Sequence, residues 1–271
     1  MIQLLPEQIE ALRELQARCR EIETDVVVIG AIAYRVWIND EKRTTEDLDV
    51  AVAVDMEELH ILTEGLVSRG WRQDQRYEHR WYSPANARLD LLPAGTKARE
   101  EKQITWPLAG TRMRLIGYDR VFADAVECQL APGLKARVVP LAVLGLLKID
   151  AYLDDPHGRE KDLQDLARLM ERYEEDGERR FSDEVLDTGV DYESAGAYLL
   201  GRDLAALRDE RDEFEVVSTF IRQLSDADHL SFQALVRLAG KDSRYQDDRL
   251  ARGIAALARG FQEMSGSAGR S

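Results

Sequence analysis

Short apolar runs separated by amphipathic segments fill the first half of the chain, a pattern typical of a sheet covered by helices. Residues 25–29 form a β-branched run that ends at Gly30, and residues 31–37 suit a short helix. In residues 47–54 acidic and apolar positions alternate, which predicts a strand whose carboxylates share one face. Apolar residues three or four positions apart predict a helix over residues 56–69, with a glycine to end it.

Three short strand candidates follow, separated by polar or Ser-Pro-Ala-Asn turn signals. They are residues 71–74, 78–82 and 87–92, and Asp90 lies in the last of them. Trp106-Pro107 indicates an extended connection in residues 94–114, a segment that the pattern otherwise leaves unassigned. Residues 121–131 suit either a strand or a helix.

The rest of the chain has a helical pattern. A strongly apolar helix is predicted over residues 141–152, with Lys148 among its leucines, and a second helix over residues 159–173. The other helices that we expect are an amphipathic one at residues 1–20 and, after an acidic stretch at 174–184, those at 199–208, 213–224 and 249–264. A tail at residues 265–271, rich in glycine and serine, is expected to be disordered.

Composition narrows the class of protein. A chain of 271 residues can bury enough apolar surface to fold unaided. Hydrophobic residues make up 44% of it, yet no apolar run approaches the roughly 20 residues of a membrane span. The first 20 residues do not resemble a signal peptide, so we expect a cytoplasmic protein. Cys19 and Cys128 are far apart and have no CxxC spacing, so we expect neither a zinc site nor a disulfide framework and take both to be buried.

The charge balance limits the partners. The chain has 37 basic and 51 acidic residues, a formal net charge of −14. Because nonspecific nucleic-acid binding depends on neutralising phosphates, this balance argues against it, although a local basic groove remains possible.

The candidate chemistry lies in the acidic strand positions. Residues two apart on a strand project from the same face, roughly 6–7 Å apart, so Asp47 and Asp49 can both reach ions between them. Asp90, on a neighbouring strand, can complete the cage. Two hard cations held roughly 3.5–4 Å apart by carboxylates activate the attacking oxygen and stabilise the leaving group in nucleotidyl transfer. The alternative is that these aspartates have no catalytic role. An acidic chain can contain Asp-x-Asp by chance, and aspartates at strand ends also cap turns.

A glycine turn precedes these carboxylates. Gly30-Ala31 stands between a strand and a helix, where backbone N–H groups can cradle a triphosphate. In this combination the chain resembles the nucleotidyltransferases of the polymerase-beta-like fold, whose signature is glycine followed by Gly or Ser, a helix, Asp-x-Asp and a third Asp on a later strand. Ala31 departs from that pattern; a serine hydroxyl there would add a hydrogen bond worth about 1–3 kcal/mol to a charged phosphate. The departure removes that hydrogen bond but leaves the backbone N–H groups in place.

Two blocks resemble one branch of that superfamily, the AbiEii type, which includes MenT-like toxins. In the stretch VIGAIAYRVWINDEKRTTEDLDVAV, the usual Arg-x-Thr-x-Asp-x-Asp arrangement is matched by Arg43, Thr45, Asp47 and Asp49. The stretch LLKIDAYLDDPHGREKDLQDL is similar to the branch's lysine, arginine and Lys-Asp-x-x-Asp helix pair, with matches at Lys148, Arg159, Lys161, Asp162 and Asp165. The resemblance covers about residues 25–173.

The resemblance implies a fold, a domain organisation and a site. It implies an α+β nucleotidyltransferase fold, with a mixed sheet flanked by helices in a domain over residues 1–138, followed by a helical domain over 139–264 that completes the site. The implied cofactors are two Mg²⁺ ions held by the catalytic residues Asp47, Asp49 and Asp90. The implied NTP-binding residues are Gly30, Ala31, Arg43, Thr45, Lys148 and Asp165.

Several nearby residues have a second interpretation. An ammonium within an apolar helix must reach solvent or find an anion, so Lys148 contacts either a triphosphate or a carboxylate such as Asp162 or Asp165. His79 and Arg80 can point toward an acceptor, although a histidine among aromatic residues more often packs. Arg35 and Trp37, on the first predicted helix, and Arg159 and Lys161 are as readily structural or solvated.

Three functions fit the sequence. The first is a transferase that moves an NMP from an NTP to a hydroxyl or phosphate of tRNA or protein, as in the toxin of a toxin–antitoxin pair with a cognate antitoxin. The second is transfer to a small molecule such as a cationic antibiotic, which an acidic protein suits. The third is a noncatalytic nucleotide-binding or regulatory module, which Ala31 motivates.

Overall fold

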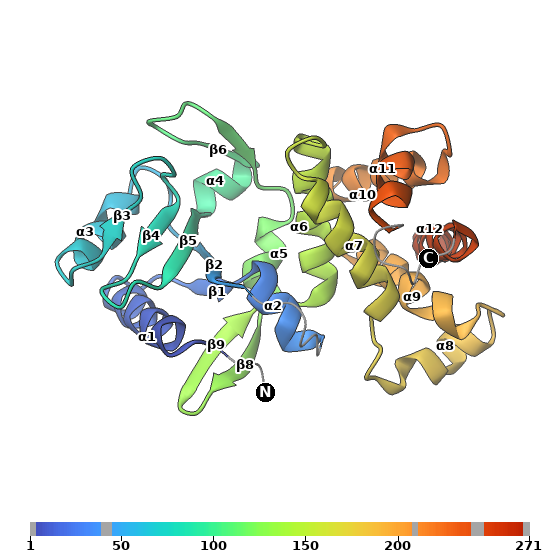
Figure 1. The fold of residues 1–271 in the computed structure, drawn as a ribbon, viewed down its shortest axis with the longest axis horizontal. Helices are drawn as coiled ribbons and strands as arrows, with labels where there is room; N and C mark the ends of the chain where they lie inside the picture. The colour runs from blue at the N-terminus through green and yellow to red at the C-terminus, as the bar shows by residue number, and fades with distance from the viewer. Residues whose placement is uncertain (1–3, 39–44, 208–210, 240–246, 268–271) are drawn as a thin grey trace. The chain divides into compact units, whose positions relative to one another are not determined.

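The computed structural model describes residues 4–38, 45–207, 211–239 and 247–267. The chain forms two compact units, Met1–Pro140 and Leu141–Ser271. The first contains the sheet, and the second is helical in its described residues (Figure 1). The predicted α+β fold class, a mixed sheet flanked by helices and followed by a helical region, is confirmed.

The first unit contains both helices and strands. Its described helices are α1 (Pro6–Glu21), α2 (Gly30–Trp37), α3 (Leu59–Val67), α4 (Thr96–Glu100) and α5 (Tyr118–Ala123). Its described strands are β1 (Val26–Val28), β2 (Asp47–Val52), β3 (Arg72–Gln73), β4 (Arg80–Tyr82), β5 (Arg88–Pro93), β6 (Gln103–Thr105), β7 (Arg112–Arg114), β8 (Val126–Ala131) and β9 (Leu134–Val138).

Seven of these strands form one mixed sheet in the order β3-β4-β5-β2-β1-β9-β8. The pairs β2–β5 and β1–β9 are parallel, and the other neighbours in this sheet are antiparallel. Strands β6 and β7 form a separate antiparallel hairpin. In the middle of the large sheet, burial alternates along β2 and β5. Leu48, Val50, Leu89 and Leu91 are fully buried, and each such side chain contributes about 1.5–3 kcal/mol to the stability.

Helix α1 is fixed to several parts of this unit by its polar side chains. Gln16 donates to the carbonyl of Lys135 at 2.8 Å, on β9. Glu14 accepts from the indole N–H of Trp71 at 2.6 Å, next to β3. Its apolar face is buried, with Leu12 fully enclosed. Helix α1 therefore connects β9 with the segment that leads into the edge strand β3.

Some elements of the first unit escaped the sequence pattern. Strand β9 was not predicted, although its buried Leu134, Ala136 and Val138 alternate with two basic residues. Residues 121–131, which suited either a strand or a helix, contain both. The segment begins with the end of α5 and continues as strand β8. The segment left unassigned at 94–114 holds α4 and the β6–β7 hairpin, whose turn contains Trp106-Pro107.

The second unit is built from helices. Its described elements are α6 (Leu141–Asp154), α7 (Glu160–Arg172), the 3₁₀ helix η1 (Glu178–Phe181), α8 (Asp183–Leu186), α9 (Tyr192–Ala206), α10 (Arg211–Ser225), α11 (Leu230–Ala239) and α12 (Asp247–Ser267). The sequence pattern found α6, α7, α9, α10 and α12 but missed η1, α8 and α11.

The predicted disordered tail needs correction at its start. Helix α12 continues to Ser267, so residues 265–267 are helical. The Ser265 hydroxyl donates to the carbonyl of Phe261 at 2.7 Å, one turn earlier, so the serine side chain satisfies a carbonyl near the helix end. Residues 268–271 lie outside the described residues.

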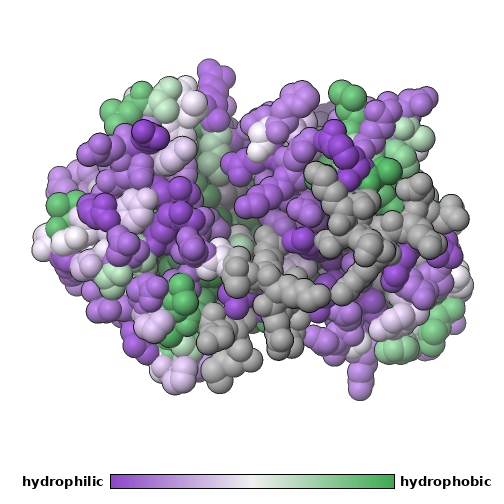
Figure 2. Space-filling model, viewed as in Figure 1, coloured by the Kyte–Doolittle hydropathy of each residue, from purple (hydrophilic) through white to green (hydrophobic). Residues whose placement is uncertain are grey.

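The helices and the surface match the absence of a membrane-spanning run in the sequence. None of the helices in the described part of the chain is long and apolar enough to span a bilayer. On the face shown in Figure 2 the surface is mostly hydrophilic, and hydrophobic residues form small separate patches.

The two cysteines differ in burial. Cys19 is buried, as expected, and burial raises the pKa of its thiol to about 12. Cys128 is only half-buried.

Helices α9 and α12 touch through two glycines. A Cβ atom added at Gly201 would overlap the backbone carbonyl of Leu257, and one added at Gly260 would overlap that of Tyr198. Glycine permits this approach because it carries no side chain. The two helix backbones therefore meet directly, and the second unit depends on that contact.

We predict that Gly201→Ala or Gly260→Ala lowers the free energy of unfolding by at least about 2 kcal/mol, because backbone cannot yield as a side chain can. Gly253→Ala, also on α12, is the matched control, since its Cβ would lie 3.7 Å from the Met170 Cε. That control should be neutral or stabilising by up to about 1 kcal/mol. Urea unfolding of the full chain measures all three; equal effects would contradict the close crossing.

Candidate active site

Three predicted carboxylates lie on one face of the sheet. Asp47 and Asp49 alternate with buried residues along β2. The parallel register of β2 and β5 places Asp49 opposite Asp90 and Asp47 opposite Arg88. Neighbouring strands are about 4.8 Å apart, so Asp49 and Asp90 lie side by side, and Asp47 lies two residues along the same face.

Arg80 holds the third carboxylate. The antiparallel register of β4 and β5 pairs Arg80 with Asp90. The guanidinium donates from Nε to Oδ1 and from Nη2 to Oδ2 of Asp90, both at 2.8 Å. This bidentate hydrogen bonding raises the pKa of the Arg80 guanidinium. His79 approaches the same carboxylate, with its Nε2 atom 3.7 Å from Oδ2.

Arg88 holds the first carboxylate. Its Nε donates to Oδ1 of Asp47, its register partner on β2. Both side chains are about one-third exposed or less, so water screens this pair only in part. Arg88 was not among the predicted site residues, although Arg88-Leu89-Asp90 repeats the polar-apolar-polar alternation of the strand beside it. Two of the three aspartates are therefore neutralised by arginines of neighbouring strand positions.

The glycine turn lies against the second carboxylate. Gly30 has φ of +66°, a left-handed conformation that favours glycine, and a Cβ there would overlap the Asp49 carboxylate. The Ile29 N–H donates to the Asp49 carbonyl at 2.9 Å, which fixes the end of β1 beside β2. Ala31 follows in the first turn of α2. The turn expected to cradle phosphates is thus adjacent to the expected metal ligands.

Other predicted residues of this unit have local roles. The Thr45 hydroxyl accepts from the Asp47 N–H at 3.3 Å and so caps the start of β2. Trp37 donates from its indole N–H to the Val139 carbonyl at 2.8 Å, in keeping with the structural role expected for it. Arg43 lies outside the described residues. The NTP-binding roles of Thr45 and Arg43 stay predictions.

The donor set suits a hard divalent cation. Asp47, Asp49 and Asp90 supply only carboxylate oxygens, the ligands that Mg²⁺ prefers. In the described segments, however, no group of three or more His, Cys, Asp or Glu residues is arranged to hold a metal ion. The chemistry of the residues fits the ion, but Arg80 and Arg88 must turn away before the carboxylates can converge on it.

Lys148 and Asp165 are described within the second unit. The buried Lys148 ammonium donates from α6 to Asp162 at 2.9 Å and to Asp165 at 2.6 Å, both on α7. Burial opposes its charge, but the two carboxylates outweigh burial and raise the pKa of Lys148. Of the two expectations for this lysine, the salt bridge is confirmed, and contact with a triphosphate stays a prediction. Arg159 is half-exposed, as a solvated charge would be.

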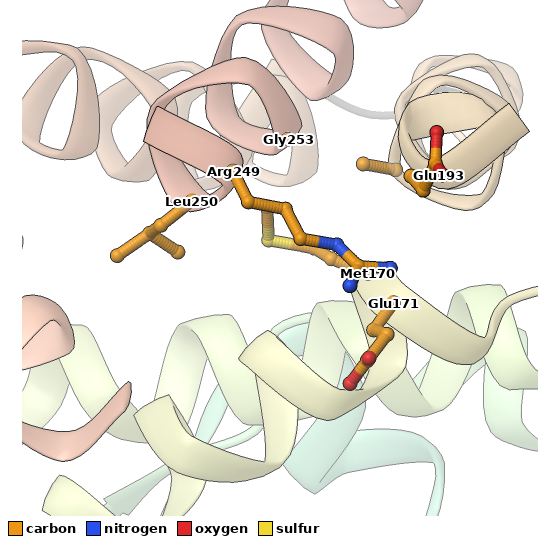
Figure 3. Close-up of a pocket in the computed structure, with 7 residues that line it drawn as sticks. Met170, Glu171, Glu193, Arg249, Leu250 and Gly253 are labelled. Atoms are coloured by element: carbon orange, nitrogen blue, oxygen red, sulfur yellow. The ribbon is translucent and has the colours of Figure 1, made fainter. Parts of the chain in front are cut away.

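The second unit also contains a small pocket. Its lining is formed by Met170, Glu171, Glu193, Ala197, Arg249, Leu250 and Gly253. Arg249 reaches from α12 toward Met170 and Glu171 on α7 (Figure 3). None of the residues predicted for catalysis or NTP binding lines it.

Comparisons with known proteins do not assign the chain to a family. No protein-family model matches it, and no curated protein matches it. It is similar to a solved nucleotidyltransferase-like protein from Paracoccidioides brasiliensis, with 13% identity and a TM-score of 0.38 over 93% of this chain and 94% of that one. It is also similar to JHP933 from Helicobacter pylori, with 17% identity and a TM-score of 0.37 over 98% of each chain.

A third similar structure is ANT(2")-Ia in complex with adenylyl-2"-tobramycin. The identity is 14% and the TM-score 0.32, over 88% of this chain and 99% of that one. At these identities and TM-scores the three likenesses carry no weight for the activity of this chain, so its function must be inferred from its residues.

We predict that Gly30→Ala displaces the Asp49 carboxylate and destabilises the first unit. Gly110→Ala is the matched control, because Gly110 has the same φ of +66° but open space around it. The control should cost only the left-handed strain, about 1–2 kcal/mol, and Gly30→Ala clearly more. Denaturant unfolding compares them; equal losses would show that Asp49 does not confine Gly30.

We predict that Lys148→Met lowers the free energy of unfolding by about 3–5 kcal/mol, since it leaves the buried Asp165 without its counter-charge. Lys135→Met is the control, because the Lys135–Glu127 pair is largely exposed and should contribute only about 0–1 kcal/mol. Adding Asp165→Leu to Lys148→Met should recover part of the loss. Chemical denaturation measures each step, and a Lys148 effect as small as the control would refute the buried pair.

Proposed function

We propose that the chain is a magnesium-dependent nucleotidyltransferase that moves an NMP from an NTP to a hydroxyl or phosphate acceptor. One observation carries this proposal: one face of the sheet presents three carboxylates, two of them paired in register, beside a left-handed glycine turn at the start of a helix. Carboxylates suit the cations that accompany a triphosphate, and the turn offers backbone N–H groups to its phosphates. The resemblance of the two sequence blocks to the AbiEii and MenT-like branch supports the same activity.

Each part of the site has a chemical role in this proposal. The Gly30 turn binds the leaving pyrophosphate, and Asp47, Asp49 and Asp90 would hold the Mg²⁺ ions, which would neutralise phosphate charge when bound. The acceptor oxygen forms a bond to the α-phosphorus, and the bond between that phosphorus and its bridging oxygen breaks. Pyrophosphate leaves, and a hydroxyl acceptor gives its proton to Asp90.

For the acceptor, our first candidate is tRNA or protein. A toxin with this activity would also have a cognate antitoxin as partner. One observation favours a second function, a noncatalytic nucleotide-binding module: Arg80 and Arg88 already neutralise Asp90 and Asp47. A module of that kind would bind an NTP without turnover.

We predict that the purified chain transfers label from an α-labelled NTP in the presence of Mg²⁺, and that a chelator stops the transfer. The acceptors offered are total RNA, total protein and a set of aminoglycosides. The double variant Asp47→Asn, Asp49→Asn should reduce transfer to background because it removes the charges that hold the metal. The control is Asp25→Asn, the same chemical change on a largely exposed side chain. Asp25 lies at the opposite end of β1 from Gly30, so this variant should leave transfer unchanged.

The outcomes separate the functions. Label in RNA or protein supports the first candidate, and label in an aminoglycoside moves the acceptor to a small molecule. Magnesium-dependent NTP binding without transfer supports the noncatalytic module. If the chain binds no NTP, or if the double variant transfers label as well as the natural sequence, the site assignment is wrong.

A further inference from the structure

We propose that Tyr77, His79 and the β6–β7 hairpin form a binding site for the unpaired bases of a single-stranded nucleic-acid acceptor. This inference rests on the proposed function and names the acceptor class of the same site. We call Tyr77, His79 and Trp106 the aromatic site.

The aromatic site is a row of rings that ends at the third carboxylate. The ring centroids of Tyr77 and His79 are 6.0 Å apart, and those of His79 and Trp106 are 5.6 Å apart. Tyr77 is 51% exposed, whereas Trp106 is buried and supports the row from below the surface. Because His79 Nε2 lies 3.7 Å from the Asp90 carboxylate, a base stacked on this row would bring its ribose close to that carboxylate.

The hairpin is locked beside these rings. The Glu78 carboxylate accepts hydrogen bonds from the backbone N–H groups of Leu108 and Ala109 at 2.7–3.0 Å. Leu108 is nevertheless 85% exposed at the hairpin turn. Leu108 is therefore a large apolar side chain that is exposed to solvent on a fixed turn. Beside the aromatic rings, it offers a second apolar surface to a planar ligand.

The sheet order puts the aromatic site on the acceptor side. Across β4-β5-β2-β1, the aromatic site adjoins β4, Asp90 lies on β5, Asp49 on β2, and Gly30 follows β1 (Figure 1). In phosphoryl transfer the attacking and leaving oxygens are roughly in line on opposite sides of phosphorus. With pyrophosphate at the Gly30 turn, the acceptor enters from the side of β4.

The local charge favours a polyanion. Residues 71–90 and 103–116 together contain six arginines, no lysine and three acidic residues, in a chain whose net charge is −14. Two of the six, Arg80 and Arg88, already neutralise Asp90 and Asp47. Arg76 and Arg112 of this set are exposed, and the Arg80 guanidinium lies 5.2 Å from the Tyr77 ring centroid. Aromatic rings with arginines between them are the usual means of binding single strands, whereas a cationic antibiotic would be repelled here.

The test is binding of a labelled single-stranded RNA of about 12 nucleotides to the full chain, without NTP or Mg²⁺, followed by fluorescence anisotropy. The double variant Tyr77→Ala, His79→Ala should raise the Kd for RNA by about 5- to 100-fold, because it removes the rings on which bases stack. Tyr77→Phe keeps the ring and should bind normally. Val126→Ala, an exposed apolar residue on β8 at the opposite edge of the sheet, is the matched control.

The affinity for ATP with Mg²⁺ is measured on the same variants. The proposal requires that the affinity for RNA fall by a larger factor than the affinity for ATP, because His79 also lies 3.7 Å from Asp90. It is overturned if ATP binding falls as much as RNA binding, which would place the base of the NTP on these rings. It is also overturned if the natural sequence does not bind the RNA, as with a protein acceptor, or if the double variant binds RNA normally.

Failure of this proposal is distinguishable from failure of the proposed function. RNA binding is measured without turnover, so a chain that transfers nothing can still show dependence on Tyr77 and His79. A chain that labels protein or an aminoglycoside but ignores RNA would keep the transferase and lose the nucleic-acid site. Thermal unfolding of each variant confirms that the half-exposed side chains were changed without loss of the fold.

Discussion

The register between β2 and β5 is the constraint on which the candidate site depends. It sets Asp49 beside Asp90 on neighbouring strands. Two unit charges at the strand spacing of about 5 Å would repel by about 3 kcal/mol at an effective dielectric constant of 20. A fold that places like charges together must compensate them. Arg88 neutralises Asp47 through this register, and Arg80 neutralises Asp90 through the separate register of β4 with β5, so strand pairing supplies counter-charges to two of the three carboxylates.

This compensation determines how a cation can enter. A divalent ion that binds between the carboxylates competes with guanidinium groups, so its affinity is reduced by the free energy needed to release them. The released arginines would remain next to the site, where a triphosphate or an acceptor strand needs positive charge. Charge neutralisation by arginine is thus compatible with both a catalytic and a purely binding role, and only turnover separates the two.

The sequence predicted the parts of the site that depend on local alternation. Asp47 and Asp49 share a face because they are two apart, and the Gly30 turn follows from a β-branched run that ends in glycine. Pairing partners were beyond reach, because Arg80 meets Asp90 through an antiparallel register that no local pattern encodes. Strand β9 alternates visibly, yet five residues with two basic positions are too weak a signal without the neighbouring strand.

The burial of Lys148 predicts that it has an anionic partner, but it does not predict which one. A buried ammonium needs an anion, and two candidates were named from the sequence, a triphosphate and the carboxylates of α7. The salt bridge explains the burial of Lys148 completely, so its location no longer argues for contact with phosphate. A loss of activity in a Lys148 variant would mix lost stability with lost binding. Only a variant whose stability is restored by removing Asp165 can show whether this lysine also acts on the nucleotide.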